Sequence, residues 1–191
     1  MLPSTVLYES AAYDPDALYI FTSQTGTSMI ALEIARSYGY CSTEEYEAAA
    51  AELTGVADRV PKVIEQAPAW AERVKRQILR SDLIAFTGAD ELHGVALEGA
   101  MKIWETVQTA SVGYEIEDGI HGPNYGYNFR HCVVVLNHGR RENEKCLALA
   151  RYMKEVWNNG LVVGRNPIDE TDLELDIPDN ATDYVDFVLA L

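Results

Sequence analysis

The sequence has few basic residues for its length and no long apolar run. Of its 191 residues, 15 are Lys or Arg and 30 are Asp or Glu, which gives a formal net charge of −15 at pH 7. A surface this acidic repels nucleic acid and anionic membranes, so we expect neither as a partner. No apolar stretch reaches the roughly 20 residues that span a bilayer, and the first residues do not resemble a signal peptide. These absences predict a cytoplasmic protein.

Cysteine is also scarce. Cys41, Cys132 and Cys146 are the only three, and their spacing suggests no pairing. Unpaired cysteines are typical of proteins kept reduced, as in the cytoplasm. The sequence therefore predicts free thiols and no disulfide framework.

Motifs for metals and cofactors are missing as well. Gly26 lies in a hydroxyl-rich segment, but no Lys follows it as in a nucleotide-binding P-loop. His93, His131 and His138 have no Cys, His or carboxylate neighbour at the spacing of metal ligands. We therefore expect no metal site and no cofactor.

The apolar residues that are present favour a globular α/β protein. They make up 48% of the chain, too many for a disordered one. Short apolar runs predict buried strands at residues 18–21, 83–87 and 132–136, with a weaker candidate at 161–163. Helical patterns follow at residues 29–38, 94–106 and 142–157. Strands that alternate with helices predict a parallel sheet with helices on both faces.

A helical region separates the first strand–helix unit from the next. Ser42 is typical of a helix N-cap, and acidic residues follow it on the first turn. Residues 43–53 and 57–80 are helical in pattern, with interruptions at Gly55, Pro61 and Pro68. We interpret this region as a helical connector. Alternating polar and apolar residues at 172–177 predict a half-exposed strand near the end of the chain.

The first candidate site is the segment Ser23-Gln24-Thr25-Gly26-Thr27-Ser28. It follows a predicted strand and opens a predicted helix. A turn in that position presents backbone N–H groups, hydroxyls and the positive end of the helix dipole to one point, which suits a phosphate. The alternative is an ordinary strand-to-helix turn capped by Ser28.

The second candidate lies on the helix predicted at residues 94–106. Glu98, Lys102 and Glu105 are spaced at i, i+4 and i+7, so they share one face. A Lys between two carboxylates could hold a substrate oxygen while one carboxylate moves a proton. The alternative is a solvated face with an ordinary ion pair.

The third candidate is His121, followed by Gly122 and Pro123. Proline restricts the backbone before it, so this His lies at a turn rather than inside a helix. A loop His near neutral pKa is a natural acid or base. It could instead simply hydrogen-bond the backbone of the turn.

The three motifs occur together, in this order, in a known family. The sequence resembles the double-SIS (sugar isomerase domain) phosphosugar proteins, which include the isomerase half of glucosamine-6-phosphate synthase and the fructosamine-6-phosphate deglycases. The segment Ser-Gln-Thr-Gly-Thr-Ser is similar to the family's phosphate loop. The segment Ala-Leu-Glu-Gly-Ala-Met-Lys-Ile-Trp-Glu is similar to the family's second-domain helix, and His-Gly-Pro follows at the family's distance.

The resemblance implies a role for each matching residue. The phosphate of a sugar phosphate would be bound by Ser23, Gln24, Thr25 and Ser28, and Glu98 would also contact the substrate. Glu105 would be the base that moves the proton, with Lys102 beside it to position the sugar. His121 would assist ring opening, in a neighbouring subunit's site or its own. No cofactor is implied.

The resemblance also implies a fold and an organisation. The fold would be flavodoxin-like, a three-layer α/β structure with a parallel sheet, in a homodimer or higher oligomer. Compared with the family, strands of the first domain and the C-terminal tail are missing from the sequence. We therefore expect a partial N-terminal SIS unit at residues 1–40, a helical connector at 41–80 and a C-terminal SIS domain at 81–191.

The implied function is a sugar-phosphate isomerase or a fructosamine-6-phosphate deglycase. Glutamine-dependent synthesis is not expected, because that activity needs an N-terminal nucleophilic cysteine and Leu2 follows Met1. The alternative is a sugar-phosphate-binding or sensor module without catalysis. A DNA-binding regulator would carry a basic helix-turn-helix segment, and none is visible.

Overall fold

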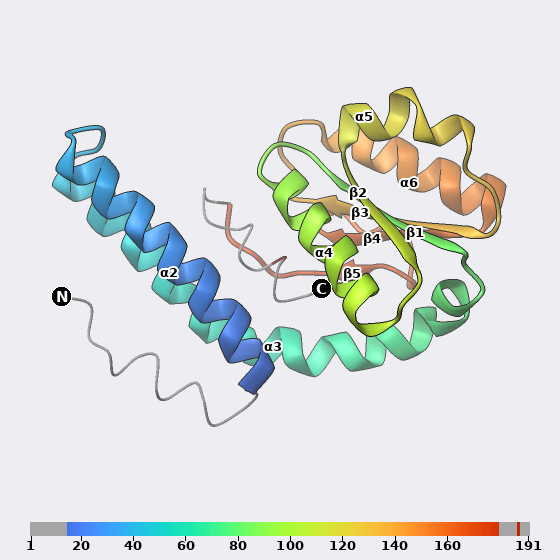
Figure 1. Ribbon diagram of the computed structural model, residues 1–191, viewed down its shortest axis with the longest axis horizontal. Helices are drawn as coiled ribbons and strands as arrows, with labels where there is room; N and C mark the ends of the chain where they lie inside the picture. The colour runs from blue at the N-terminus through green and yellow to red at the C-terminus, as the bar shows by residue number, and fades with distance from the viewer. Residues whose placement is uncertain (1–14, 180–186, 188–191) are drawn as a thin grey trace.

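The computed structural model describes residues 15–179 and Phe187, with side chains from residue 26 onward. Two long helices come first, followed by an alternation of strands and helices (Figure 1). The helices are α2 (Pro15–Ser37), α3 (Thr43–Leu79), α4 (Leu92–Thr106), α5 (Ile116–His121), the 3-10 turn η2 (Pro123–Tyr125) and α6 (Asn143–Trp157). The strands are β1 (Leu83–Gly88), β2 (Ala110–Glu115), β3 (His131–Asn137), β4 (Gly160–Gly164) and β5 (Leu173–Glu174).

The five strands form one sheet in the order β2-β1-β3-β4-β5, and every pair is parallel. This is the flavodoxin-like order, so the predicted fold class is confirmed. The order reverses between β1 and β3, because the chain leaves β1 toward β2 and then returns to the other side. Ligands of open parallel sheets bind beyond the carboxyl ends of the strands at such a switch point.

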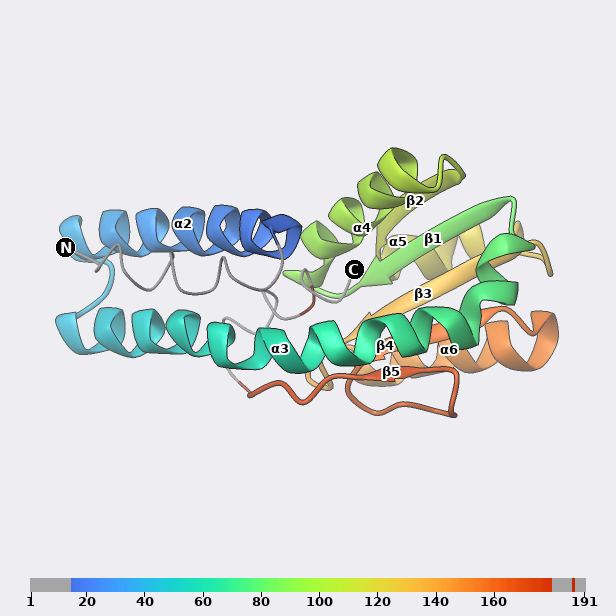
Figure 2. The same ribbon diagram turned by 90° about the horizontal axis from the view of Figure 1, so that it is seen from below.

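Alternate residues of each strand enter different cores, one on each face of the sheet. Ile84 and Phe86 of β1 pack with α3 and α4, whereas Ala85 packs with α5 and α6. In β3, Val134 faces the first core and Val133 the second. Both faces are thus covered by helices (Figures 1 and 2). This explains the unbroken apolar sequence of β3.

The predicted strands at residues 83–87, 132–136 and 161–163 are confirmed as β1, β3 and β4, and the predicted helices 94–106 and 142–157 as α4 and α6. Sequence patterns missed β2, an edge strand whose residues are half-buried or exposed. The strand predicted at residues 172–177 is shorter than expected, because only Leu173 and Glu174 pair with β4.

The strand predicted at residues 18–21 is wrong, because these residues lie inside α2. The helix predicted at residues 29–38 is the second half of this longer helix. A buried parallel strand needs a neighbouring strand to pair with its backbone, and no described strand lies beside α2. The apolar run instead contributes to a helix that packs against α3.

The prediction of two helices in the connector is also wrong, because α3 is continuous from Thr43 to Leu79. Pro61 and Pro68 lie inside it, both on its exposed side, where water can bond the carbonyl groups that a proline leaves unpaired. Buried residues on the opposite side hold the helix: Val63, Trp70 and Val74. The predicted N-cap is confirmed, since Ser42 and Glu45 form a capping box.

Two regions can now be defined. The hairpin consists of α2 and residues 43–60 of α3, which lie side by side (Figures 1 and 2). Its small core is built on Met29, Leu53 and Val56. The body is the remainder of α3 together with the sheet and its helices, and it contains both large cores.

Candidate functional site

The structure brings the three charged residues of α4 together. Lys102 Nζ lies 2.8 Å from Glu105 Oε2 and 3.3 Å from Glu98 Oε1. The side chains of Lys102 and Glu98 are about one-third exposed, and that of Glu105 is about half exposed. Hydrogen bonding to Glu105, with support from Glu98, raises the pKa of Lys102. Lys102 therefore stays charged and can stabilise a negative oxygen, while Glu105 is accessible as a base.

An apolar stripe runs beside this charged group on α4. Leu97, Met101 and Trp104 are all about half exposed, although they are large apolar residues at helical spacing. The indole N–H of Trp104 donates to the carbonyl of Ser111 at 2.9 Å, which ties the end of α4 to β2. Beside a stripe like this, the charged group would lose its water if another domain or subunit covered the helix.

His121 does not join the α4 group within this chain. It is the last residue of α5, which packs on the side of the sheet that α6 covers, whereas α4 packs on the other side. The helix α4 also ends before β2 begins, whereas α5 begins where β2 ends. The sheet therefore lies between α5, which ends at His121, and α4, which carries Glu105; Figure 1 shows the two helices on opposite faces of the sheet.

His121 instead has neighbours of its own. Its Nε2 atom lies 3.2 Å from Glu117 Oε2, and its side chain is 76% exposed. Glu117 also pairs with Lys145 of α6, which lowers the pKa of the Glu117 carboxyl. The structure thus presents an exposed imidazole backed by a carboxylate, available to a ligand or to a second molecule.

The predicted phosphate loop has a different backbone from the one expected. Ser23, Gln24, Thr25 and Ser28 all lie inside α2 rather than in a turn between a strand and a helix. Their backbone N–H groups are therefore in a helix interior and do not converge on one point. The side chains of the first three lie outside the description. The phosphate-binding role of the four residues stays a prediction.

The cysteines are free thiols, as predicted. Burial raises the pKa of both Cys132 and Cys146 to about 12, so neither is a nucleophile near neutral pH.

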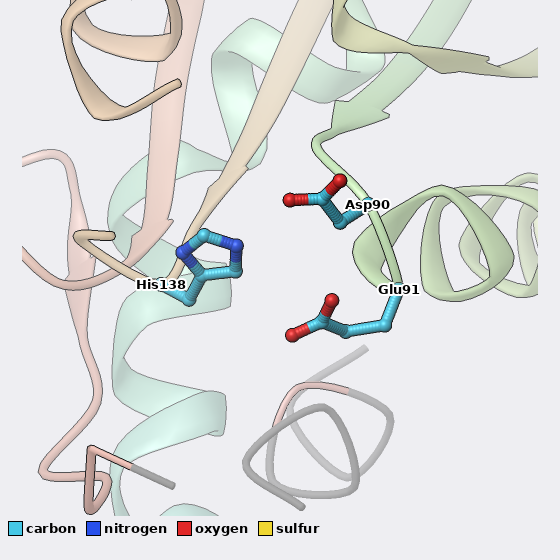
Figure 3. A group of neighbouring side chains, drawn as sticks. All are labelled: Asp90, Glu91 and His138. Carbon is cyan, nitrogen blue, oxygen red and sulfur yellow. The ribbon is translucent and has the colours of Figure 1, made fainter. Parts of the chain in front are cut away.

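A second polar group lies at the carboxyl edge of the sheet, at the switch point between β1 and β3. Asp90 and Glu91 follow β1, and His138 follows β3. Figure 3 shows the imidazole facing the two carboxylates, and one ligand atom from each residue lies within 4.8 Å of the others. His138 is only 2% exposed. Sequence spacing indicated no carboxylate near His138, whereas the fold places Asp90 and Glu91 beside it.

This group fits a metal ion poorly. The backbone N–H of Arg140 donates to His138 Nδ1 at 3.1 Å, so the neutral ring carries its proton on Nε2, the nitrogen that remains for the carboxylates. A metal on Nε2 would require the proton on Nδ1, which would then face the Arg140 N–H. Glu91 is already paired with Arg140, at 2.6 Å, and Asp90 with Arg141, at 3.3 Å.

Sequence spacing could not have revealed this group, because 46 residues lie between Glu91 and His138 along the chain. A usable signal was the position of these polar residues directly after two predicted parallel strands. The carboxyl ends of adjacent parallel strands meet at one edge. Burial lowers the pKa of His138, and the positive charge of Arg140 acts in the same direction.

The fold is that of the phosphosugar isomerase (SIS) domain proteins. A proposed phosphosugar isomerase from Clostridium difficile 630 is 28% identical, with a TM-score of 0.70 over 83% of this chain and 46% of its own. The C-terminal domain of glucosamine-fructose-6-phosphate aminotransferase from Francisella tularensis is 17% identical, with a TM-score of 0.71 over 83% of this chain and 46% of its own.

A third solved structure, glucosamine-6-phosphate deaminase from Thermotoga maritima, is 20% identical, with a TM-score of 0.58 over 87% of this chain and 48% of its own. The chain spans about half the length of these structures. No model of a protein family matches the sequence, and no curated protein matches it either. Within the described residues, no helix has the length and apolar character needed to cross a membrane.

Proposed function

We propose that this protein binds a sugar phosphate and moves a proton on its open-chain form. The observation that carries the proposal is the placement of Lys102 between Glu98 and Glu105 on one exposed face of α4. The fold supports the same class of substrate, since several similar structures are described as acting on phosphosugars.

In the proposed reaction, Glu105 removes a proton from the carbon next to the carbonyl group and returns it to the neighbouring carbon. Negative charge develops on the enediol oxygen during this transfer, and the Lys102 ammonium would stabilise it. Glu98 would hold Lys102 in place and contact the sugar. The hydroxyl proton on the carbon that loses its hydrogen must also pass to the former carbonyl oxygen, and for an isomerase these two transfers are the whole reaction. For a fructosamine-6-phosphate deglycase, loss of the amine and hydrolysis would follow.

His121 would help to open the sugar ring by moving a proton at the ring oxygen or the anomeric hydroxyl. Because the sheet separates His121 from Glu105, it would act in the site of a second copy of the chain. We therefore propose a homodimer or larger assembly, with the apolar stripe of α4 as one part of the covered surface.

The test is the substitution Glu105→Gln, which keeps the shape of the side chain and removes the base. We expect kcat to fall by roughly a hundredfold or more, with sugar-phosphate binding near that of the parent. The assay offers fructose 6-phosphate, glucosamine 6-phosphate and fructoselysine 6-phosphate side by side. The control is Glu72→Gln, which removes an exposed carboxylate from an ordinary i,i+3 ion pair with Lys75. Turnover that Glu105→Gln leaves unchanged would contradict the proposal.

The second candidate is a sugar-phosphate-binding module without catalysis. It is favoured by one observation: a single chain does not bring His121 to the α4 group. This alternative predicts sugar-phosphate binding without turnover of any of the three substrates, in both the monomeric and the assembled protein.

A further inference from the structure

Two arginines at the carboxyl edge of the sheet converge on one acceptor. Arg140 follows β3, and Arg165 follows the neighbouring strand β4. Arg140 Nη1 lies 3.4 Å from Asp179 Oδ1, and Arg165 Nη1 lies 3.6 Å from the same oxygen. The chain has twice as many acidic as basic residues. Two guanidinium groups that contact the same carboxylate oxygen are therefore an unusual local concentration of positive charge.

Other contacts hold both guanidinium groups in position. Arg140 Nη2 pairs with Glu91 Oε1 at 2.6 Å, and Arg165 Nη2 donates to the carbonyl of Ile177 at 2.7 Å. The side chain of Asn137 at the end of β3 donates to the carbonyl of Arg165 at 3.0 Å. The Nη1 atoms therefore point toward Asp179 from fixed directions, and both arginine side chains are only about one-quarter exposed.

Asp179 fits this position imperfectly. Charge-assisted hydrogen bonds between a guanidinium and a carboxylate are usually about 2.7–2.9 Å long, and both contacts here are longer. A single oxygen atom, Asp179 Oδ1, contacts both guanidinium groups. The Asp179 side chain is 67% exposed, so water can reach it and a ligand could displace it.

We propose that Arg140 and Arg165 form a binding site for a phosphate group, and that Asp179 occupies this site when no phosphate is bound. A phosphate monoester carries up to two negative charges and three terminal oxygens, so each guanidinium could bond a separate oxygen at normal length. The ligand would be a small phosphorylated molecule or inorganic phosphate. This site lies at the carboxyl edge of the sheet, beyond β3 and β4. It is separate from the charged group of Glu98, Lys102 and Glu105 on α4.

The competing position for a phosphate in this domain is the N-terminus of α4, where the helix dipole would favour an anion. Asp90 and Glu91 precede this helix, and the side chain of the N-cap residue Glu91 makes no capping hydrogen bond. Two carboxylates at that point repel a phosphate. Glu91 also lies beside the arginine pair, but there Arg140 offsets its charge and Arg165 adds a second positive charge, so the pair is the better location for an anion at this edge.

The test is calorimetric titration of the full chain with inorganic phosphate and, separately, with fructose 6-phosphate. Asp179→Asn removes the competing carboxylate and should tighten phosphate binding by about fivefold. Arg165→Gln removes one guanidinium and should weaken binding by about tenfold or more. The matched control is Asp82→Asn, the same charge change at the opposite edge of the sheet, where Asp82 pairs with Arg130.

Equal phosphate affinity for Asp179→Asn and Asp82→Asn would overturn the proposal, as would the absence of binding to both the parent and Asp179→Asn. The double variant Thr25→Ala, Ser28→Ala tests the other predicted phosphate site. If it abolishes binding while Arg165→Gln leaves binding intact, the phosphate binds there and the arginine site is wrong. Because Asp179→Asn is an exposed substitution, its result stands even if Arg165→Gln misfolds. Tighter binding of fructose 6-phosphate than of inorganic phosphate would identify a sugar phosphate as the ligand.

Discussion

The hairpin and the body of this protein are stabilised by different kinds of contact. The hairpin has a core of three buried residues, and its ion pair between Glu33 and Arg36 joins residues that are three positions apart in sequence. The body has two large cores and polar contacts that join distant segments. Since all three Trp residues lie in the body, Trp fluorescence reports on the body alone, whereas circular dichroism reports on both regions.

The largest effect should come from Asp172, a fully buried carboxylate of the body. It accepts bonds from the backbone N–H groups of Val162 and Ile168 at 2.7 Å and pairs with Lys154 at 2.8 Å. In Asp172→Asn the amide would leave buried donors without an acceptor, so we expect a loss of about 3 kcal/mol in the free energy of unfolding. Urea unfolding followed by Trp fluorescence measures it.

The matched change in the hairpin is Glu33→Gln, which breaks an exposed ion pair with Arg36. Water solvates both groups in either state, so we expect no measurable change in unfolding. If Asp172→Asn lowered the free energy of unfolding as little as Glu33→Gln does, the buried contacts of Asp172 would not be what stabilises the loop before β5.

The next largest effects on stability should come from replacing glycine by alanine at two positions, with a loss of stability in the body and a gain in the hairpin. A Cβ atom at Gly113 of β2 would lie 2.7 Å from backbone atoms of Ala96 and Leu97, so Gly113→Ala should destabilise the body by about 1–3 kcal/mol. In the hairpin, a Cβ at Gly55 meets only the flexible end of Arg59 at 3.5 Å. Gly55→Ala should stabilise the helix by up to about 1 kcal/mol. Thermal unfolding of both variants by circular dichroism checks this; a loss of stability in Gly55→Ala contradicts it.

A smaller effect is expected at the start of α3. The Ser42 hydroxyl accepts from the Glu45 N–H at 3.1 Å, and the Glu45 carboxylate accepts from the Ser42 N–H at 2.7 Å. Ser42→Ala removes the first of these bonds and should cost about 1 kcal/mol. Amide hydrogen exchange should become faster in the hairpin and stay unchanged in the body. Faster exchange in β1 or β3 would show that the two regions unfold together.

The smallest expected effect is a pH dependence of the body. The pKa of His138 lies below its usual 6.5, mainly because of burial; Arg140 and Arg165 act in the same direction, and Asp90 and Glu91 act against them. The unfolded chain therefore takes up a proton before the folded protein does. The free energy of unfolding should fall as the pH is lowered from about 7 toward 5. His138→Gln should flatten this slope. An unchanged slope would contradict the assignment.

Local patterns in the sequence predicted the parts of this structure that depend on local causes. The capping box at Ser42, the apolar strand β3 and the charged face of α4 all follow from spacings of a few residues. The edge strand β2 was missed because it is neither continuously apolar nor strictly alternating. The group at the switch point was missed because its members meet only when β1 and β3 pair. The apolar run at residues 18–21 suited a helix as well as a strand, and periodicity alone could not decide between them.

The continuity of α3 has a mechanical consequence. Its 37 residues correspond to about 55 Å of helix, anchored at one end by Trp70 and Val74 in the body and joined at the other end to α2. Near its midpoint, Pro61 and Pro68 leave two backbone carbonyls without their usual donors, which makes bending there less costly than elsewhere. The hairpin can therefore tilt about this section of α3. A bend of about 5° at that section would move the far tip by about 2–3 Å, so the hairpin could change its position while the other end of α3 stays packed on the sheet.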